Sequence, residues 1–187
     1  MEAIADTFYV RKIQAGEEQY FTPLLKRYSR QVFSLIVKMT ENREDAEELT
    51  QDVFLKVYRS LDSFHGNSSF STWLYRIAYN TAISALRRQK HERLSIEEGL
   101  ADDSLAEEDA MDTLEQTSRE EQMERLEQAL EQLPPDERAL ILLFYRQEKR
   151  VDEIAIITGL TVSNVKTKLH RIRKKMLALM LKIKKED

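Results

Sequence analysis

Residues 151–180 have the sequence VDEIAIITGLTVSNVKTKLHRIRKKMLALM, and this stretch decides the fold of the C-terminal part of the chain. A short apolar segment over 151–158 is followed by the turn Gly-Leu-Thr at 159–161 and then by a longer basic segment over 162–180. Two helices joined by a short glycine-containing turn, the second of them basic, are typical of a helix-turn-helix unit. The sequence therefore predicts such a unit here.

The second helix of this unit has an apolar face and a basic face. At 100° per residue, the residues that share the apolar side are Val165, Leu169, Ile172, Met176 and Leu179. The residues on the other side are Ser163, Lys166, Thr167, His170, Arg171 and Lys174. Residues 163–185 contain nine Lys or Arg and no Asp or Glu, whereas a solvated face usually mixes both signs. We expect this face to contact DNA; an ordinary solvated face or a helix lying on an anionic membrane are the alternatives.

An acidic segment precedes this unit. Residues 92–124 carry thirteen acidic side chains against two arginines, a net charge of −11 in a chain whose formal net charge is −4. Its first part, up to residue 117, has too few large apolar residues to form a core, so we interpret residues 92–117 as a linker. From residue 118 the apolar residues return at helical spacing, and Pro134-Pro135 separates two of the expected helices. The C-terminal domain is therefore expected to span residues 118–187.

The first 91 residues form the other expected domain. Apolar residues recur at helical spacing from Tyr20 to Leu86, enough for one helical bundle. Only four glycines and three prolines occur in 187 residues, which leaves few places for tight hairpin turns. We predict an all-α protein with two helical domains joined by the acidic linker.

One helix of the bundle, expected over residues 69–90, carries a stripe suited to a nucleic-acid strand with unstacked bases. Its members are Trp73, Arg76, Asn80, Ser84 and Arg87. Indole and guanidinium planes stack on bases, cations hold phosphates and an amide hydrogen-bonds a base edge. A single tryptophan in a bundle is equally often part of the core, and that alternative stays open. The preceding loop, residues 62–69, is rich in turn formers and contains Phe64, which we expect to be exposed.

A third surface lies on the helix expected over residues 43–60. The apolar residues on one side of this helix are enough to pack it on the bundle. The opposite side is polar, with one leucine among acidic and amide groups. The residues concerned are Glu48, Gln51, Asp52 and Leu55. One exposed leucine is ordinary, but this arrangement weakly indicates a protein partner with a basic surface.

Several classes of function are excluded by composition. The chain has no cysteine, its three histidines share no metal-ligand spacing, and it has no glycine-rich phosphate loop. We find no combination of residues for catalysis, so we expect no enzyme, no cofactor and no metal. No apolar run reaches the roughly 18 residues of a membrane span. The N-terminus lacks the basic start and apolar stretch of a secretory signal, so we expect a cytoplasmic protein without membrane insertion.

The order of these motifs resembles the two-domain sigma factors of bacterial RNA polymerase, in the extracytoplasmic-function (ECF) group. The resemblance covers about residues 20–180. Its most specific parts are DAEELTQDVF at 45–54, LDSF at 61–64, FSTWLYRIAYN at 70–80, LPPDER at 133–138, EIA at 153–155 and VKTKLHR at 165–171.

This resemblance implies a promoter-recognition subunit. The face with Glu48, Gln51, Asp52 and Leu55 would bind the clamp helices of core RNA polymerase. The C-terminal domain would recognise the duplex "minus thirty-five" element and contact the polymerase flap, and an anti-sigma factor is a further implied partner. The residues implied in melting the "minus ten" element and holding its separated strand are Phe64, Trp73, Arg76, Asn80 and Arg87.

Two other classes of protein remain compatible with the residues alone. One is a free-standing helix-turn-helix regulator whose N-terminal bundle senses a ligand or partner; it would bind duplex DNA without polymerase. The other is a helical adaptor with acidic and basic parts, for which the basic face of residues 163–174 has no role in DNA binding.

Overall fold

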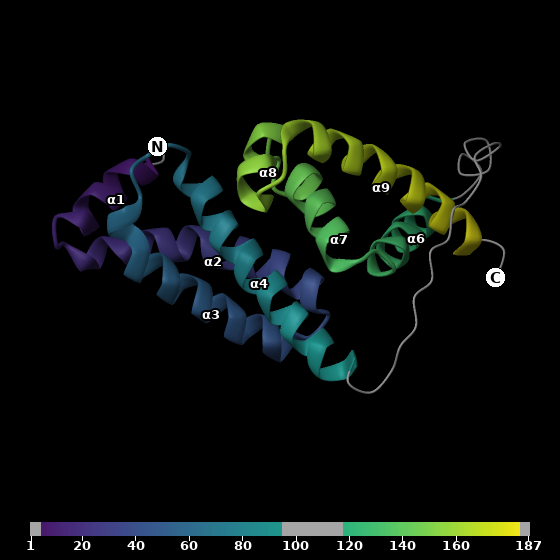
Figure 1. Cartoon of the computed structure of the whole chain (residues 1–187), viewed down its shortest axis with the longest axis horizontal. Coiled ribbons are helices and arrows are strands. Elements are labelled where there is room, and N and C mark those ends of the chain that lie inside the picture. Colours follow the sequence, from purple (N-terminus) through teal and green to yellow (C-terminus); the bar gives the residue numbers. More distant parts are fainter. Residues whose placement is uncertain (1–4, 95–117, 184–187) are drawn as a thin grey trace.

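The computed structural model describes residues 5–94 and 118–183, and these residues form helices, turns and loops without a strand (Figure 1). This confirms the predicted all-α fold. The N-terminal domain consists of α1 (Asp6–Gln14), the short 3-10 turn η1 (Glu18–Tyr20), α2 (Phe21–Thr40), α3 (Arg43–Ser60), the turn η2 (Leu61–Ser63) and α4 (Phe70–Leu94). The C-terminal domain consists of α6 (Arg119–Glu131), α7 (Pro135–Ile141), η3 (Leu142–Arg146), α8 (Val151–Thr158) and α9 (Val162–Ile183).

Local sequence explains where α2 ends and α3 begins. Glu41 adopts a left-handed backbone conformation with φ 57°, which ends α2. The next residue, Asn42, accepts hydrogen bonds through its side chain from the backbone N–H groups of Glu44 and Asp45, at 2.9 and 3.1 Å. These bonds satisfy two of the N–H groups that a helix start leaves unpaired. The chain therefore reverses here in two residues, and α2 and α3 pack side by side.

The interior of the N-terminal domain is formed by the apolar faces that the sequence predicted. Its fully enclosed side chains come from α2, α3 and α4 and include Leu35, Ile36, Val53, Val57 and Leu74. Parts of α3 and α4 that point away from this core are exposed, whereas α8 packs on another part of α4.

The helix-turn-helix unit is also formed as predicted. Gly159 ends α8 with φ 73°, a conformation that residues with a Cβ rarely adopt. Thr161 then begins α9, because its hydroxyl accepts a hydrogen bond from the N–H of Asn164 at 3.1 Å. Upstream, Pro135 is the first residue of α7. Helix α7 continues directly into the π-helical turn η3, in which the N–H of Gln147 donates to the carbonyl of Leu142 at 3.0 Å.

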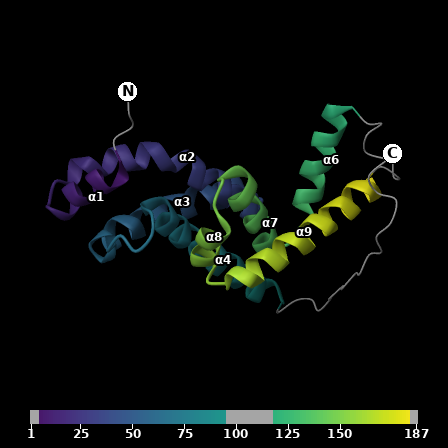
Figure 2. The same cartoon turned by 90° about the horizontal axis from the view of Figure 1, so that it is seen from above.

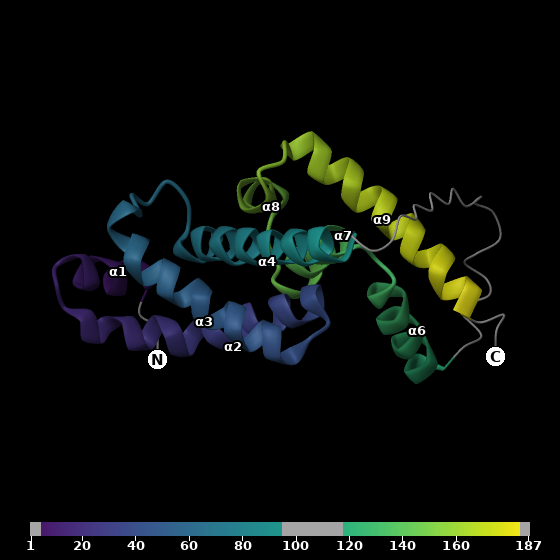
Figure 3. The same cartoon turned by 60° about the horizontal axis from the view of Figure 1, so that its bottom comes forward.

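The two domains are in contact. Helix α7 packs on α2, and α8 packs on α4, as seen from two directions in Figures 2 and 3. Helix α4 runs to Leu94, three residues beyond the expected domain end. The predicted linker over residues 92–117 lies almost wholly outside the described residues.

Candidate nucleic-acid and polymerase interfaces

Helix α9 has the two faces that its sequence predicts. Val165, Leu169, Ile172 and Met176 are buried. The six residues expected to contact DNA are all exposed: Ser163, Lys166, Thr167, His170, Arg171 and Lys174. Because they lie along one side of a helix that follows a tight turn, they can enter the major groove of a duplex together.

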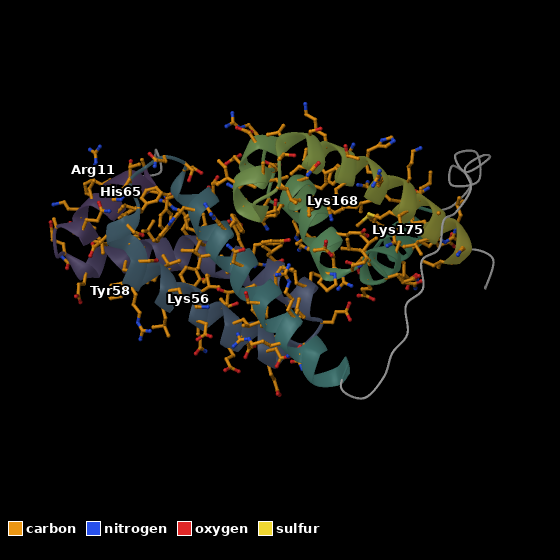
Figure 4. All side chains as sticks on the ribbon, in the orientation of Figure 1. Arg11, Lys56, Tyr58, His65, Lys168 and Lys175 are labelled. Carbon is orange, nitrogen blue, oxygen red and sulfur yellow. The ribbon has the colours of Figure 1, made fainter. Side chains whose placement is uncertain are left out.

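The basic residues of α9 fall into two sets. Lys168 and Lys175 point toward α7, where their ammonium groups lie 3.3 Å from Asp136 and 3.1 Å from Glu137 (Figure 4). Lys166 and Arg171 have no ion-pair partner among residues 5–94 and 118–183. The uncompensated positive charge is therefore concentrated on the outer face and not spread around the helix.

A neighbouring aromatic pair extends this basic surface, and the sequence analysis missed it. The guanidinium of Arg173 lies 5.4 and 5.5 Å from the ring centres of Phe144 and Tyr145, and its Nε donates to the Tyr145 hydroxyl at 2.7 Å. Tyr145 is 57% exposed. Arginine held over aromatic rings is fixed in direction, which suits contact with a phosphate. Arg173 lies 28 positions after Tyr145 and 29 after Phe144, so no local pattern indicated this contact.

The stripe on α4 is divided between surface and interior. Arg76, Asn80 and Arg87 are exposed, one or two turns apart along the helix. Trp73 is half buried: its ring lies 5.3 Å from that of Phe64 and 6.0 Å from that of Phe70. Trp73 is therefore partly a core residue, since its ring packs on Phe64 and Phe70, and partly a surface residue next to the polar stripe.

The expectation that Phe64 is exposed is wrong. Its side chain is only 8% exposed, because the η2 turn directs the ring inward, edge-on to Phe70 at 5.9 Å. The side-chain amide of Gln14 donates to the carbonyls of Leu61 and Phe64, at 2.9 and 3.2 Å. These two bonds attach the loop to α1. A direct contact of this ring with DNA requires the loop to move, whereas Trp73, Arg76 and Asn80 are accessible as they stand.

A cavity of about 460 Å³ lies between α1 and this loop. Arg11 and Gln14 of α1 form one wall, and Asp62, His65 and Gly66 form the other; Figure 4 labels Arg11 and His65 at its rim. A cation, an amide, a carboxylate and an imidazole supply hydrogen-bond donors and acceptors to a planar polar group. This cavity was not predictable from the sequence, because α1 and the loop are about fifty residues apart in the chain.

The outer face of α3 presents the expected acidic and apolar groups. Glu48, Gln51 and Asp52 are exposed, and Leu55 is 52% exposed. An apolar strip continues from Leu55 through Tyr58, which is 38% exposed. The Tyr58 ring packs edge-on against Phe21 of α2 at 5.2 Å. Two exposed apolar side chains one turn apart on α3, flanked by acidic residues, suit a protein-binding surface.

Other kinds of site find no support in the part of the chain that the structure describes. Among residues 5–94 and 118–183, no group of three His, Asp or Glu side chains could hold a metal ion. None of the described helices is long and apolar enough to cross a membrane.

Comparison with known proteins assigns both domains. The model of the family Sigma-70 region 2 matches residues 24–92, and the model of Sigma-70, region 4 matches residues 123–176. The ECF RNA polymerase sigma factor SigW of Bacillus subtilis (strain 168) is 31% identical over 175 residues, which cover 88% of this chain and 90% of that relative. This chain belongs to the ECF sigma factors. Sigma factors are the subunits that direct RNA polymerase to promoters, so the function implied by the resemblance is confirmed at this level.

Further relatives of this sigma factor agree. The ECF RNA polymerase sigma-E factor of Escherichia coli (strain K12) is 32% identical over 177 residues, 92% of each chain. The solved structure of the sigma factor RpoE from Bartonella quintana, in complex with the anti-sigma factor NepR, has a TM-score of 0.66 and 24% identity, covering 86% of this chain and 96% of that one. That likeness shows a shared fold. Region 2 contains the surfaces on α3 and α4, and region 4 contains the basic face of α9.

Proposed function

We propose that this sigma factor directs core RNA polymerase to promoters by binding two elements with two different surfaces. The basic face of α9 binds the upstream element as duplex, and the polar stripe of α4 binds the downstream element as a separated strand. The observation that carries the proposal is that both surfaces are exposed, in two domains matched by two different sigma-factor regions. Two weak binding sites on one chain reinforce each other through effective concentration.

Duplex recognition is assigned to α9. Ser163, Lys166 and Thr167 lie in its first two turns, the part of a recognition helix that meets base edges. His170, Arg171 and Lys174 continue the face toward the phosphates. In the described structure no acidic residue neutralises Lys166 or Arg171, which favours their binding to a polyanion.

Strand separation is assigned to α4 and the loop before it. Trp73 offers the exposed part of its ring to an unstacked base, Asn80 offers an amide to a base and Arg76 offers a cation to the backbone. Unstacking a base costs a few kcal/mol, which contacts to the extruded base must offset. The cavity between α1 and residues 62–66 is large enough for a base and is lined by groups that hydrogen-bond one.

Polymerase binding is assigned to α3. The acidic and apolar face with Glu48, Gln51, Asp52 and Leu55 suits a basic, partly apolar helical surface such as the clamp helices. The C-terminal domain is assigned the contact with the flap. We assign the protein no catalytic step and no cofactor, and we place its action with polymerase in the cytoplasm. A relative of similar fold binds an anti-sigma factor, and we propose a partner of that class for this chain.

Open-complex formation tests the proposal. The full chain and core polymerase are incubated with a library of random DNA fragments; bound fragments are selected, and unpaired thymines are then detected by permanganate. The proposal predicts a bubble at a fixed position in the selected fragments, present only when both proteins are added. Specific protection of duplex DNA by the chain alone, with no bubble in the presence of polymerase, would identify a free-standing regulator.

A further inference from the structure

Helix α1 carries an exposed aromatic ring between two cations. The Phe8 side chain is 43% exposed. Arg11 and Lys12 follow it by three and four positions, so both lie beside the ring on the same side of the helix. The opposite side packs on the domain, since Val10 and Ile13 are buried. Phe8, Arg11 and Lys12 thus form a surface that does not belong to the core, the α1 surface.

Two tyrosines hold the Phe8 ring in place. Its centre lies 5.6 Å from that of Tyr9 and 5.8 Å from that of Tyr20, edge-on in both cases. The guanidinium of Arg27 lies 5.5 Å from the centre of the Tyr9 ring. The Lys12 ammonium lies 5.6 Å from the centre of the Tyr20 ring. A ring that is already fixed loses little conformational entropy when a partner stacks on it.

Helix α1 is itself attached to the rest of the domain at both ends. At its start, Asp6 forms an ion pair with Arg27 and accepts a hydrogen bond from the Tyr28 hydroxyl at 2.5 Å. At its end, the amide of Gln14 donates to two carbonyls of the segment between α3 and α4. The α1 surface therefore has a defined position relative to the loop before α4.

The charges around the α1 surface favour an anion. Arg11 is exposed, and no carboxylate among residues 5–94 and 118–183 forms an ion pair with it. The acidic side chains of residues 5–20 each have another partner: Asp6 pairs with Arg27, Glu17 with Lys12 and Glu18 with the Tyr58 hydroxyl. An exposed aromatic ring beside a cation is typical of sites for single-stranded nucleic acid, because the ring stacks on a base and the cation binds a phosphate.

The α1 surface continues the path proposed for the separated strand. Arg11 lines the cavity of about 460 Å³ between α1 and residues 62–66, and it lies one helical turn from Phe8. On the other side of the cavity, the ring of Phe64 lies 5.3 Å from that of Trp73, the first residue of the α4 stripe. In Figure 1 the loop before α4 runs between α1 and the start of α4. The α4 stripe, the cavity and the α1 surface therefore follow one another.

We propose that the α1 surface is a further contact for the separated promoter strand. Phe8 stacks on a base next to the segment bound by α4, and Arg11 binds the adjoining phosphate. The inference rests on the proposed function, because it requires a strand held on α4. It also goes beyond that function, since the model of Sigma-70 region 2 matches residues 24–92 and does not include α1.

Photocrosslinking tests the stacking contact. The template is a promoter fragment selected with the wild-type chain and core polymerase, in which 5-iodouracil replaces single bases of the unpaired strand. Ultraviolet light joins this base to an aromatic side chain stacked on it. A crosslink is expected at one or two positions of the strand, on the tryptic peptide that ends at Arg11. Phe8→Tyr should keep the crosslink, and Phe8→Leu should reduce it at least tenfold. A crosslink to this peptide that is unchanged in Phe8→Leu, or no crosslink to it at any position, would overturn the inference.

Truncation of the strand tests what the contact contributes to affinity. The templates keep the upstream duplex and carry a single strand that is shortened stepwise from either end of the bubble. On the complete strand, Phe8→Leu and Arg11→Gln are each expected to weaken binding of the full chain with core polymerase by about fivefold or more. Once shortening removes the base that stacks on Phe8, these variants and the wild type should bind equally. Arg30→Gln is the matched control, because it removes an exposed cation of α2 that does not line the cavity.

The same templates separate the competing outcomes. Equal binding of Phe8→Leu and wild type on the complete strand overturns the inference and leaves the proposed function intact. Weakening by Phe8→Leu that is the same on every shortened strand also overturns it, and assigns the α1 surface to a contact with polymerase. Failure of the wild-type chain and core polymerase to open any fragment overturns the proposed function, and the inference with it. Melting temperatures should match the wild type, because neither substituted side chain is buried.

Discussion

At the scale of single residues, Asn80 gives the sharpest test of the α4 stripe, because it is exposed and has no role in the core. Asn80→Ala is expected to reduce promoter opening by about tenfold, since a side chain that pairs well with a base contributes about 1–3 kcal/mol. The measurement is permanganate reactivity of the bubble with core polymerase present. Affinity for polymerase and the melting temperature should both be unchanged. A fall in melting temperature would show that Asn80 supports the fold instead.

The two sets of lysines on α9 allow a matched comparison. Lys166→Ala and Arg171→Ala should each lower the slope of log affinity against log salt by about one unit, because each removes one cation from the surface that lies against the DNA polyanion. Lys175→Ala removes the same charge, but its ammonium lies 3.1 Å from Glu137, so a smaller change in slope is expected. The measurement is titration of duplex DNA at several salt concentrations. Equal effects of all three substitutions would mean that the face makes no defined contacts.

Single residues also show the limits of sequence reasoning here. The exposure of the six positions on α9 was predictable, because helical spacing alone separates them from the buried residues. Phe64 was not, since its burial depends on rings that belong to the next helix. The contact of Arg173 with Phe144 and Tyr145 was equally unpredictable, because the π-helical turn after α7 places these two rings beside it.

At the scale of secondary-structure elements, the turn between α8 and α9 sets the direction of α9, the helix with the proposed DNA-binding face. Gly159 has φ 73°, and no atom lies within 4 Å of the position that a Cβ would take. A larger residue there would therefore strain the backbone but would not clash with a neighbour. Gly159→Ala is expected to lower the free energy of unfolding by roughly 1 kcal/mol. Gly159→Asn should cost less, because asparagine tolerates this conformation. Urea denaturation measures both, and an alanine variant as stable as wild type would contradict the argument.

Helix α3 carries the proposed polymerase contact on its outer face. Asp52→Ala combined with Leu55→Ala is expected to weaken binding of core polymerase by at least about tenfold, with the melting temperature unchanged, since both side chains are exposed. Glu47→Ala is the control, because it removes an acidic residue whose partner is Arg43 on the same helix. Binding is measured by fluorescence anisotropy of the labelled sigma factor. Equal weakening by Glu47→Ala would mean that the loss of any negative charge on α3 weakens polymerase binding, without a specific contact by Asp52 or Leu55.

Element boundaries were largely predictable, because proline, glycine and capping residues mark them in the sequence. The burial of α6 was less so. Met123, Leu126, Leu130 and Leu133 share helical spacing, yet Met123 is 54% exposed and Leu126 is 37% exposed. Helix α6 packs on α9, yet its only buried residue is Ala129 near its C-terminal end; Leu133, which follows the helix, is buried as well. Periodicity shows which side of a helix is apolar, but it does not show how much of that side another helix covers.

At the scale of the whole molecule, the contact between the domains includes a half-buried carboxylate, that of Glu153. Burial acts to raise the pKa of Glu153, but hydrogen bonds from Thr72 and from the backbone of Arg150, together with nearby Lys149, outweigh it and lower the pKa. Because the pKa of Glu153 is lowered while the two domains are in contact, the charged carboxylate stabilises this contact at pH values above the ordinary pKa range of glutamate. This contribution is lost as the pH falls through the lowered pKa. Contact between the domains should therefore persist near neutral pH and weaken in acid, once Glu153 is protonated; energy transfer between dyes on Lys26→Cys of α2 and Glu127→Cys of α6 measures this.

Glu153→Gln provides the control for this acid transition. It removes the titrating group, so the part of the loss of contact that follows the lowered pKa should disappear. An unchanged acid transition in this variant would assign the loss of contact to other carboxylates.

The contact between the domains could not be predicted from sequence. Thr72 and Glu153 are 81 residues apart, and neither belongs to a pattern that points to the other. The division into two helical domains was accessible, because the acidic segment differs so clearly from the periodic sequence on either side. What joins the domains is decided by tertiary placement, which composition and spacing do not encode.

The most direct test of the account is transcription with purified components. Core polymerase is supplied with the full chain and a promoter fragment selected as described above, and the 5′ ends of the transcripts are mapped. The account predicts initiation at one defined site that depends on the added chain and is reduced at least tenfold by Asn80→Ala or by Lys166→Ala with Arg171→Ala. Transcripts that are the same with and without the chain, or initiation that survives loss of both surfaces, would contradict it.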